Sequence, residues 1–331
     1  MIKLDWVRKI YEDGMHCAFG DLAYWKGQYY ACFRRAEAHA VWPYGDVFVI
    51  RSPNLEQWEV CGMLTTGLDD RDPALAVDGD RLWVFFGSRY TETDNQAQPV
   101  QDGAQWLHAH ASYTCDGTSW TVPKSIYERG YWLWRPYRFP DAFYCAAYGR
   151  GPEEDEDGVD FLKSPNGLNW TKVSRLIGRG EGNETALYRY EDGRILAVVR
   201  GLKAETHFFE SPPPYVSWRG WTVPYPIQAP VIARVAGQLV VAGRYFSSPD
   251  AKDQELSPGE RRTRLWAIEG ESVRYLLDLP SGGDTSYAGF VVPEEGKLLV
   301  NYYSQHEYLD APNFVAGRKP ASIYLAQVSF S

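Results

Sequence analysis

The chain has 331 residues, a formal net charge of −9 and 15% aromatic residues. Hydrophobic residues make up 44% and charged residues 23%, ordinary proportions that exclude general disorder, collagen and coiled coil. The acidic balance excludes the basic face expected of a nucleic-acid binder, and no apolar run approaches the roughly 20 residues that cross a bilayer.

Five segments share one pattern, in which two apolar stretches flank a turn that contains glycine. Apolar stretches on either side of a Gly or Asp-Gly turn predict a β-hairpin. In chain order the turn glycines are Gly27, Gly79, Gly193, Gly237 and Gly296. A sixth hairpin without a turn glycine fits residues 138–148, in the long gap between the second and third glycines.

These hairpins recur about every 50 residues, which is typical of propeller blades with four strands each. A second repeat ends in tryptophan and follows several hairpins; its copies span 52–58, 114–120 and 164–170, with a degraded copy near Trp218 or Trp221. It resembles the Asp-box, a turn in which Asp or Asn binds the backbone and Gly takes positive φ. We therefore predict an all-β fold, a single six-bladed β-propeller domain over residues 1–331, with Asp-box-like turns on the face away from the ligand.

Hairpin geometry predicts where the charged residues gather. The start of a hairpin's first strand lies beside the end of its second, which places Asp21 near Arg34, and Glu184 near Arg200. The innermost strands of all blades begin around one central mouth, where a ligand site is expected. Four rim residues each follow their turn glycine by seven positions: Arg34, Arg200, Arg244 and Tyr303. Arginines grouped in this way suit recognition of a carboxylate, although each ion pair could instead tie two strand ends together.

Together these repeats resemble the sialidase (neuraminidase) superfamily of six-bladed propellers over nearly the whole chain. The resemblance implies a glycosidase whose nucleophile is a tyrosine opening the last blade, activated by a glutamate opening the fourth; Tyr287 and Glu184 stand there. It also implies arginines that bind the substrate carboxylate. Arg200 matches one of these, and Arg244 or Arg262 matches another.

The sequence departs from that family at the first blade. The family's opening Arg-Ile-Pro is replaced by the segment 16–21, so one carboxylate-binding arginine is missing or relocated. The family's catalytic aspartate corresponds to the segment 33–39, which contains no aspartate, so that His39, Glu37 or Asp46 would have to serve as acid/base.

Three other functions remain open. Arg71-Asp72-Pro73 is similar to a motif of five-bladed glycosidases, which use one carboxylate from each of three blades. In this chain Asp21, Asp72 and Glu184 could form such a set. Histidines near hairpin ends, His16, His39 and His306, suit a polysaccharide lyase with His/Tyr chemistry. The third alternative is a carbohydrate-binding propeller without catalysis.

Other signals are weaker. His108 and His110 lie on one side of a predicted strand but lack a third ligand, and the acidic run 153–157 predicts a solvated loop. We predict no metal and no cofactor. The N-terminal residues contain no secretory signal, which predicts a cytoplasmic protein, or a periplasmic or secreted one if a signal preceded this sequence.

The preferred hypothesis is a sialidase-like, exo-acting glycoside hydrolase with a retaining mechanism on an acidic or polar sugar. The predicted catalytic residues are Tyr287, Glu184, Asp21, Asp72 and His39. The predicted substrate-binding residues are Arg34, Arg200, Arg244, His16, Tyr303 and His306.

Overall fold

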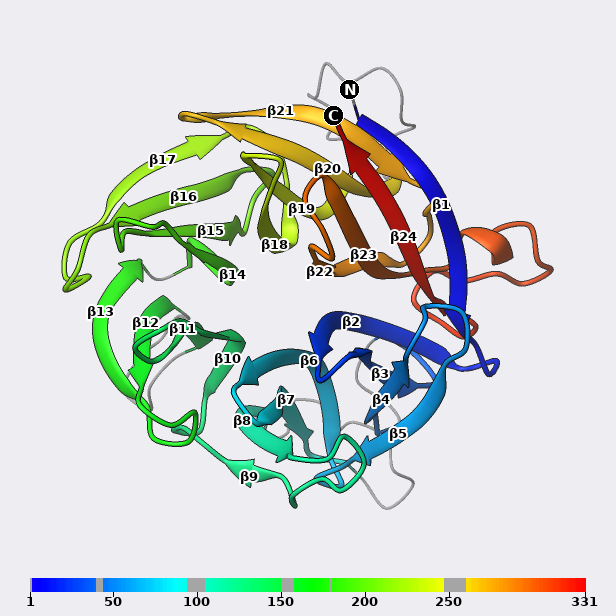
Figure 1. Ribbon diagram of the computed structural model, residues 1–331. Coiled ribbons are helices and arrows are strands. Elements are labelled where there is room, and N and C mark those ends of the chain that lie inside the picture. The colour runs from blue at the N-terminus through cyan, green and yellow to red at the C-terminus, as the bar shows by residue number, and fades with distance from the viewer. Residues whose placement is uncertain (1, 40–43, 94–104, 150–157, 179, 247–259) are drawn as a thin grey trace.

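The computed structural model describes residues 2–39, 44–93, 105–149, 158–178, 180–246 and 260–331. Within them the chain forms six four-stranded antiparallel sheets around a central axis, as Figure 1 shows. Each sheet is one blade, whose first strand lies innermost. The prediction of an all-β, six-bladed propeller is confirmed, and the six sheets exclude the five-bladed alternative.

Blades 1 to 3 follow one another in the first half of the chain. Blade 1 consists of β2 (His16–Trp25), β3 (Gln28–Ala36), β4 (Asp46–Ser52) and β5 (Glu59–Leu64). Blade 2 consists of β6 (Asp69–Asp78), β7 (Arg81–Thr91), β8 (Gln105–Thr114) and β9 (Lys124–Ser125). Blade 3 consists of β10 (Tyr131–Arg138), β11 (Phe143–Gly149), β12 (Gly158–Ser164) and β13 (Thr171–Ile177).

Blades 4 to 6 complete the ring. Blade 4 consists of β14 (Gly182–Arg189), β15 (Ile195–Gly201), β16 (Thr206–Ser211) and β17 (Arg219–Val223). Blade 5 consists of β18 (Gln228–Val235), β19 (Gln238–Phe246), β20 (Arg261–Glu269) and β21 (Ser272–Leu279). Blade 6 consists of β22 (Thr285–Val291), β23 (Lys297–Ser304), β24 (Ser322–Phe330) and β1 (Ile2–Tyr11).

Blade 6 therefore takes its outer strand from the beginning of the chain. β1 pairs antiparallel with β24, from Ile2 opposite Phe330 to Tyr11 opposite Ile323. The two ends of the chain lie side by side in Figure 1. A short 3-10 helix, η1 (His306–Tyr308), follows β23. Among the described residues, no helix has the length and apolar character required to span a membrane.

Tryptophan-ending turns join the third and fourth strands of the first three blades. In the turn before β13, Asn166 Oδ1 accepts two backbone hydrogen bonds at 3.0 and 2.9 Å, and Gly167 has a φ of 75°. The ring of Trp170 then packs 6.4 Å from that of Phe85 in the preceding blade. The mouth is on the face where the innermost strands begin. Because neighbouring strands run in opposite directions, the turns between third and fourth strands lie on the other face.

Every innermost strand contains a β-bulge close to its start. In each blade two residues of the first strand lie opposite one residue of the second. The bulged pairs are Phe19-Gly20, Asp72-Pro73, Arg135-Pro136, Asn183-Glu184, Ala229-Pro230 and Tyr287-Ala288. A bulge changes the direction in which side chains project, and three of these pairs use proline, which has no N–H to contribute to the ladder.

Five bulges hold a non-glycine residue at positive φ. These residues are Phe19 at 61°, Asp72 at 49°, Arg135 at 45°, Ala229 at 51° and Tyr287 at 49°. A left-handed conformation costs such a residue about 1–3 kcal/mol and persists only where the surrounding structure enforces it, often at functional sites. Two predicted catalytic residues, Asp72 and Tyr287, occupy the same position in different blades.

Candidate active site

Tyr287 and Glu184 meet at the centre of the ring. Tyr287 belongs to the bulge of β22 in blade 6, and Glu184 to the bulge of β14 in blade 4. The Tyr287 hydroxyl donates a hydrogen bond of 2.5 Å to Glu184 Oε1. Only 6% of Tyr287 and 4% of Glu184 are exposed. Two residues 103 positions apart in the chain therefore form one buried tyrosine–glutamate pair.

The other oxygen of Glu184 is also fully engaged. Glu184 Oε2 accepts hydrogen bonds of 2.9 Å from an Arg200 guanidinium nitrogen and from the backbone N–H of Ala229. Burial acts to raise the pKa of Glu184, but Arg200 and the Tyr287 hydroxyl outweigh it, so this pKa lies below its ordinary value. Glu184 is therefore ionised at neutral pH.

Tyr287 is protonated at neutral pH. Burial, followed by the charges of Glu184 and Asp72, raises the pKa of the Tyr287 hydroxyl well above its ordinary value. The Arg244 guanidinium lies 5.1 Å from the centre of the Tyr287 ring. Such a cation stabilises negative charge on the phenol oxygen as the proton leaves.

Asp72 enters the same region from the bulge of blade 2. Its Oδ1 is buried and has no hydrogen-bond partner among the described residues. Burial, opposed by Arg71 and assisted by Glu184, raises the pKa of Asp72 to about 7. A carboxyl group with this pKa can hold a proton near neutral pH and donate it, which is the property required of a general acid.

Tyr148 is a further residue of this region that sequence reasoning missed. Burial, followed by the charges of Asp72 and Glu184, raises the pKa of its hydroxyl well above the ordinary value. Tyr148 ends the one predicted hairpin without a turn glycine. The position was therefore visible in the sequence, although nothing there distinguished Tyr148 from the other tyrosines.

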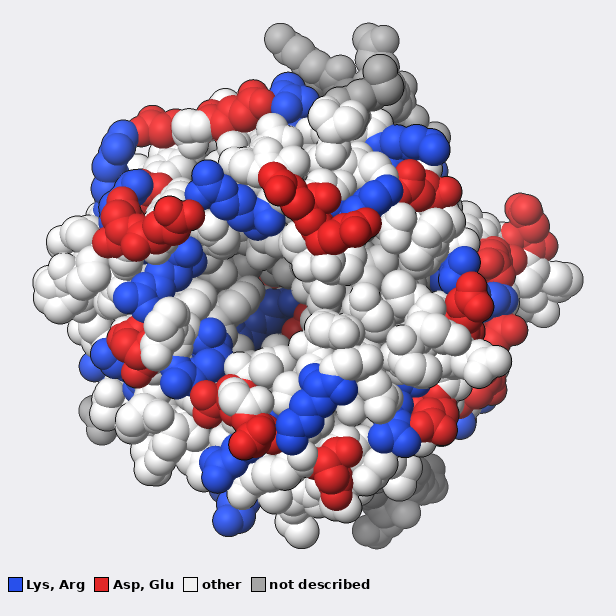
Figure 2. Space-filling model, in the orientation of Figure 1, with Lys and Arg blue, Asp and Glu red and all other residues white. Residues whose placement is uncertain are grey.

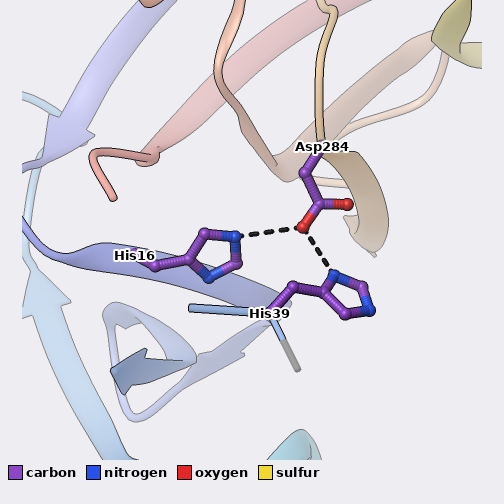
Figure 3. Close-up of side chains that lie close together, drawn as sticks. All are labelled: His16, His39 and Asp284. Atoms are coloured by element: carbon purple, nitrogen blue, oxygen red, sulfur yellow. Dashed lines mark hydrogen bonds and ion pairs between the residues drawn. The ribbon is translucent and has the colours of Figure 1, made fainter. Parts of the chain in front are cut away.

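A second cluster lies beside the tyrosine–glutamate pair and is centred on Asp284, one residue before β22. Asp284 Oδ2 lies 3.0 Å from His16 Nε2 and 2.5 Å from His39 Nδ1, as Figure 3 shows. Its other oxygen accepts a hydrogen bond of 2.9 Å from the Tyr303 hydroxyl and lies 3.5 Å from an Arg244 nitrogen. Sequence reasoning missed Asp284, because it stands in a turn and not in a hairpin.

The carboxylate of Asp284 fixes the tautomers of both histidines. An ionised carboxylate only accepts hydrogen bonds, so each ring nitrogen facing it carries a proton. Burial, assisted by Arg244 and Arg71, lowers the pKa of His39 in spite of Asp284, and burial likewise lowers that of His16. At neutral pH His39 is therefore a neutral imidazole. Its Nε2 is turned away from Asp284 in Figure 3 and makes no hydrogen bond within the described part of the chain.

We expect nuclear magnetic resonance titration to show that both imidazoles have pKa values below the ordinary histidine value of 6.5. Replacing Asp284 with Asn should lower the pKa values of His16 and His39 further, because the carboxylate is the group that raises them. His108, whose pKa is lowered by burial and Arg129, should be unchanged in this variant. A wild-type His39 that titrates above 6.5 would contradict this description.

The three residues also offer a possible ligand set for a metal ion. One ligand atom from each of His16, His39 and Asp284 lies within 4.8 Å of the others. However, metal-binding histidines usually donate their second N–H to an acceptor, and His16 Nδ1 is buried without a partner among the described residues. Arg244 and Arg261 also lie 3.5 and 3.9 Å from Asp284 Oδ1, where their charges oppose a cation. The donor set thus fits a hydrogen-bonded cluster better than a metal centre.

Arg34 lies beneath the mouth. It is fully buried and donates to Asp69 Oδ1 at 2.8 and 2.5 Å and to the carbonyl of Ala38 at 2.6 Å. Arg34 is therefore not exposed to a ligand in the mouth, contrary to the prediction. Its hydrogen bond to the Ala38 carbonyl instead holds the segment that carries His39. Arg71 stands closer to the mouth, where it donates to the His39 carbonyl at 2.8 Å and lies 5.0 Å from the Phe19 ring.

The predicted pairing of Asp21 with Arg34 is wrong. The bulge at Phe19-Gly20 shifts the register, so that Asp21 lies opposite Cys32. Asp21 Oδ1 instead accepts a hydrogen bond of 3.0 Å from Arg135, and Oδ2 accepts one of 2.9 Å from the Leu75 backbone. These contacts join blades 1, 2 and 3 below the mouth and leave Asp21 a structural role.

The register of the rim residues is less regular than predicted. Arg34, Arg244 and Tyr303 share one position, each opposite the residue before a bulge. Arg200 differs by one position: it lies directly opposite the bulge of β14, and Gly201 is the residue that lies opposite the residue before that bulge. The cause is the longer turn before β15. This difference is what brings Arg200 to Glu184.

Several remaining predicted residues lie apart from the site. His306 Nδ1 lies 3.0 Å from Ser304 Oγ, and Arg262 is hydrogen-bonded to Glu260. His108 and His110 contact serine hydroxyls at 2.6 and 2.9 Å. The acidic run 153–157 lies outside the described residues.

Figure 2 shows an opening in the centre of the ring, with basic and acidic side chains in its depth. Beside it, a cavity of about 330 Å³ is lined by His39, Asp284 and Arg244 together with Ala38, Arg261, Ala316, Gly317 and Arg318. The mouth thus combines the tyrosine–glutamate pair, the carboxyl group of Asp72 with its pKa raised to about 7, the neutral imidazole of His39 and several arginines. This combination can transfer protons next to an anionic ligand.

No family model matches the sequence, and no curated protein matches it either. Similar solved structures include a protein of unknown function from Dyadobacter fermentans, with a TM-score of 0.77 at 18% identity; the match covers 100% of this chain and 99% of the other. A structure of Trypanosoma rangeli sialidase with 2,3-difluorosialic acid, described as a covalent intermediate, has a TM-score of 0.67 at 13% identity. That match covers 95% of this chain and 54% of the sialidase.

A mutant of NanB sialidase from Streptococcus pneumoniae has a TM-score of 0.64 at 11% identity, with 96% of this chain and 70% of the other covered. The protein therefore has the six-bladed propeller fold of the sialidases. It spans about half the length of the Trypanosoma rangeli enzyme.

Proposed function

We propose that the protein is a retaining glycoside hydrolase for acidic sugars, with Tyr287 as its nucleophile and Glu184 as the base. The observation that carries this proposal is the buried 2.5 Å hydrogen bond from the Tyr287 hydroxyl to Glu184. A nucleophile beside an oriented base is the arrangement that covalent catalysis requires. The base is itself oriented, by Arg200 and the Ala229 backbone.

In the first step Tyr287 Oη attacks the anomeric carbon while Glu184 takes the phenol proton. The bond from the anomeric carbon to the leaving oxygen breaks, and Asp72 gives that oxygen its proton. The raised pKa of about 7 makes Asp72 the stronger acid candidate, while the neutral His39 suits a hydrogen-bond acceptor. Arg244 stabilises the charge that develops on the phenol oxygen.

In the second step water attacks the anomeric carbon of the glycosyl-tyrosine. Asp72, now ionised, takes a proton from the water. The bond to Tyr287 Oη breaks, and the tyrosine regains its proton from Glu184. Two displacements at one carbon return the starting configuration, so the product retains its anomeric stereochemistry.

The charges favour an acidic sugar as substrate. Arg200 and Arg244 flank the tyrosine–glutamate pair, and Arg71 lies on the other side of the mouth. A neutral phenol avoids the repulsion that a carboxylate nucleophile would meet from an anionic sugar, which is why tyrosine nucleophiles suit such substrates. The covalent intermediate in Trypanosoma rangeli sialidase is a precedent on the same fold.

Trapping the covalent intermediate tests the mechanism directly. Wild-type protein would be incubated with 2,3-difluorosialic acid and, in parallel, with fluorinated uronosyl fluorides. We expect one probe to add its glycosyl mass to the protein, with peptide mapping to Tyr287, and Tyr287→Phe protein to gain no mass. An adduct on another residue would overturn the assignment of the nucleophile.

A screen of sialosides, uronides and rhamnosides separates the proposed function from its alternatives. Hydrolysis yields a saturated sugar of retained configuration, whereas a lyase that uses the free Nε2 of His39 as base yields an unsaturated uronate that absorbs ultraviolet light. A binding propeller yields affinity without turnover. The product, or the absence of any product from a protein that binds the sugar, therefore distinguishes the three.

A further inference from the structure

The cavity beside His39 is not needed for the two displacements described above. It lies among blades 5, 6 and 1, and its lining includes three arginines, Arg244, Arg261 and Arg318. Arg244 is also the residue that lies over the Tyr287 ring. The cavity and the nucleophile thus share one wall, and a ligand bound at Tyr287 can extend into the cavity.

Among the described residues that line this cavity, basic side chains outnumber acidic ones. Asp284 is the one carboxylate among its described lining residues, and it already serves His16, His39 and Tyr303. The described lining thus contains three arginines and one carboxylate, and Arg244 and Arg261 lie 3.5 and 3.9 Å from that carboxylate. Within the described part of the chain the Arg318 side chain has no ion-pair partner, and Arg261 lies 3.9 Å from Asp284 with 43% of its side chain exposed.

The wall that carries Arg318 is held in place without a ligand. Ala38 and Arg318 form an antiparallel bridge, and the His39 backbone N–H donates to the Gly317 carbonyl at 2.7 Å. Gln305 is fully buried, and its Oε1 accepts backbone hydrogen bonds of 3.0 Å from Asp284 and 2.9 Å from Gly317. A preformed wall lowers the entropic cost of binding.

The arginines thus define two anion-binding positions. Arg200 and Arg244 form the inner position around Tyr287, and Arg261 and Arg318 form the outer position in the cavity. We propose that the outer position binds a second anionic group, a carboxylate or a sulfate, on the sugar next to the one that is cleaved. This inference rests on the proposed function and narrows its substrate class to acidic oligosaccharides with charge on consecutive residues.

Direct binding measurements test the outer position. Calorimetry would compare α2,8-linked disialic acid with sialic acid, and digalacturonate with galacturonate, in wild-type and Glu184→Gln protein. We expect one disaccharide to bind about tenfold or more tightly than its monosaccharide, as one added guanidinium–carboxylate contact supplies. The gain should weaken at high salt, because half-exposed charges are screened.

Variants then locate the gain. The double variant Arg261→Gln/Arg318→Gln should bind the disaccharide no more tightly than the monosaccharide, and its affinity for the monosaccharide should equal that of wild type. Arg274→Gln, on the outer strand of blade 5 and 53% exposed, removes a similar surface charge and is the matched control. A gain that survives the double variant, or a disaccharide that binds no tighter than its monosaccharide, would overturn the inference.

The same data separate this inference from the proposed function. Hydrolysis by wild-type protein without any affinity gain for a disaccharide would overturn the outer position and leave the hydrolase intact. An affinity gain that depends on Arg261 and Arg318 without any turnover by wild-type protein would overturn the hydrolase and retain the outer position.

Discussion

Tyr287→Phe protein should hydrolyse its glycoside substrate about a thousandfold or more slowly than wild type, the order of loss seen when an enzyme loses its nucleophile. The substitution removes one oxygen atom and keeps the ring that packs against Phe19 and Trp134. Glu184→Gln should reduce kcat comparably, because an amide cannot take the phenol proton. Steady-state kinetics on the substrate identified by the glycoside screen would measure both effects.

Two controls separate chemistry from folding. Tyr302→Phe removes a hydroxyl from the neighbouring buried tyrosine of β23, whose bond is to the Pro280 carbonyl, and should leave kcat unchanged. Thermal unfolding should show both site variants folded near the wild-type melting temperature. Near wild-type turnover by folded Tyr287→Phe protein would remove the tyrosine mechanism.

Asp72→Asn should slow hydrolysis by an amount that depends on the leaving group of the substrate. Loss of a general acid typically costs about 10²–10⁴-fold, and this loss should appear with sugar leaving groups. It should be small with 4-nitrophenol, which leaves without being protonated. Since the pKa of Asp72 is raised to about 7, wild-type kcat/KM should fall as pH rises through that value, and the variant should lose this dependence.

His39→Gln is the comparison for this prediction. Its neutral imidazole should contribute to binding, so the variant should raise KM for sugar and nitrophenyl leaving groups alike. If His39→Gln shows the dependence on leaving group and Asp72→Asn does not, the proton donor is the imidazole held by Asp284.

Much of the fold could be predicted because the information is local. Alternating apolar stretches and turn glycines repeat within each blade, so the hairpins and their number follow from short segments. The meeting of Glu184 with Tyr287 also followed, since a ring brings all hairpin starts to one centre. The choice of these two residues as a catalytic pair came from the resemblance to the sialidase superfamily, which implies a tyrosine that opens the last blade and a glutamate that opens the fourth.

The details of the site were harder to predict because they depend on bulges and on neighbouring blades. One bulged residue moved Asp21 away from Arg34 and toward Arg135, and a longer turn moved Arg200 toward Glu184. The prolines at positions 73, 136 and 230 were the available sign of these bulges. The raised pKa of Asp72 has no local sign, because it arises from the burial that several blades produce together.

The pairing of β1 with β24 has a consequence for folding. Residues at opposite ends of the described chain must find one another before the last sheet acquires its fourth strand, and contacts this distant in sequence slow folding. Until then the outer edge of β24 is left with unsatisfied backbone groups, a ready template for strands of other molecules. Refolding at high protein concentration should therefore favour aggregation, and dilution should favour recovery of the closed ring.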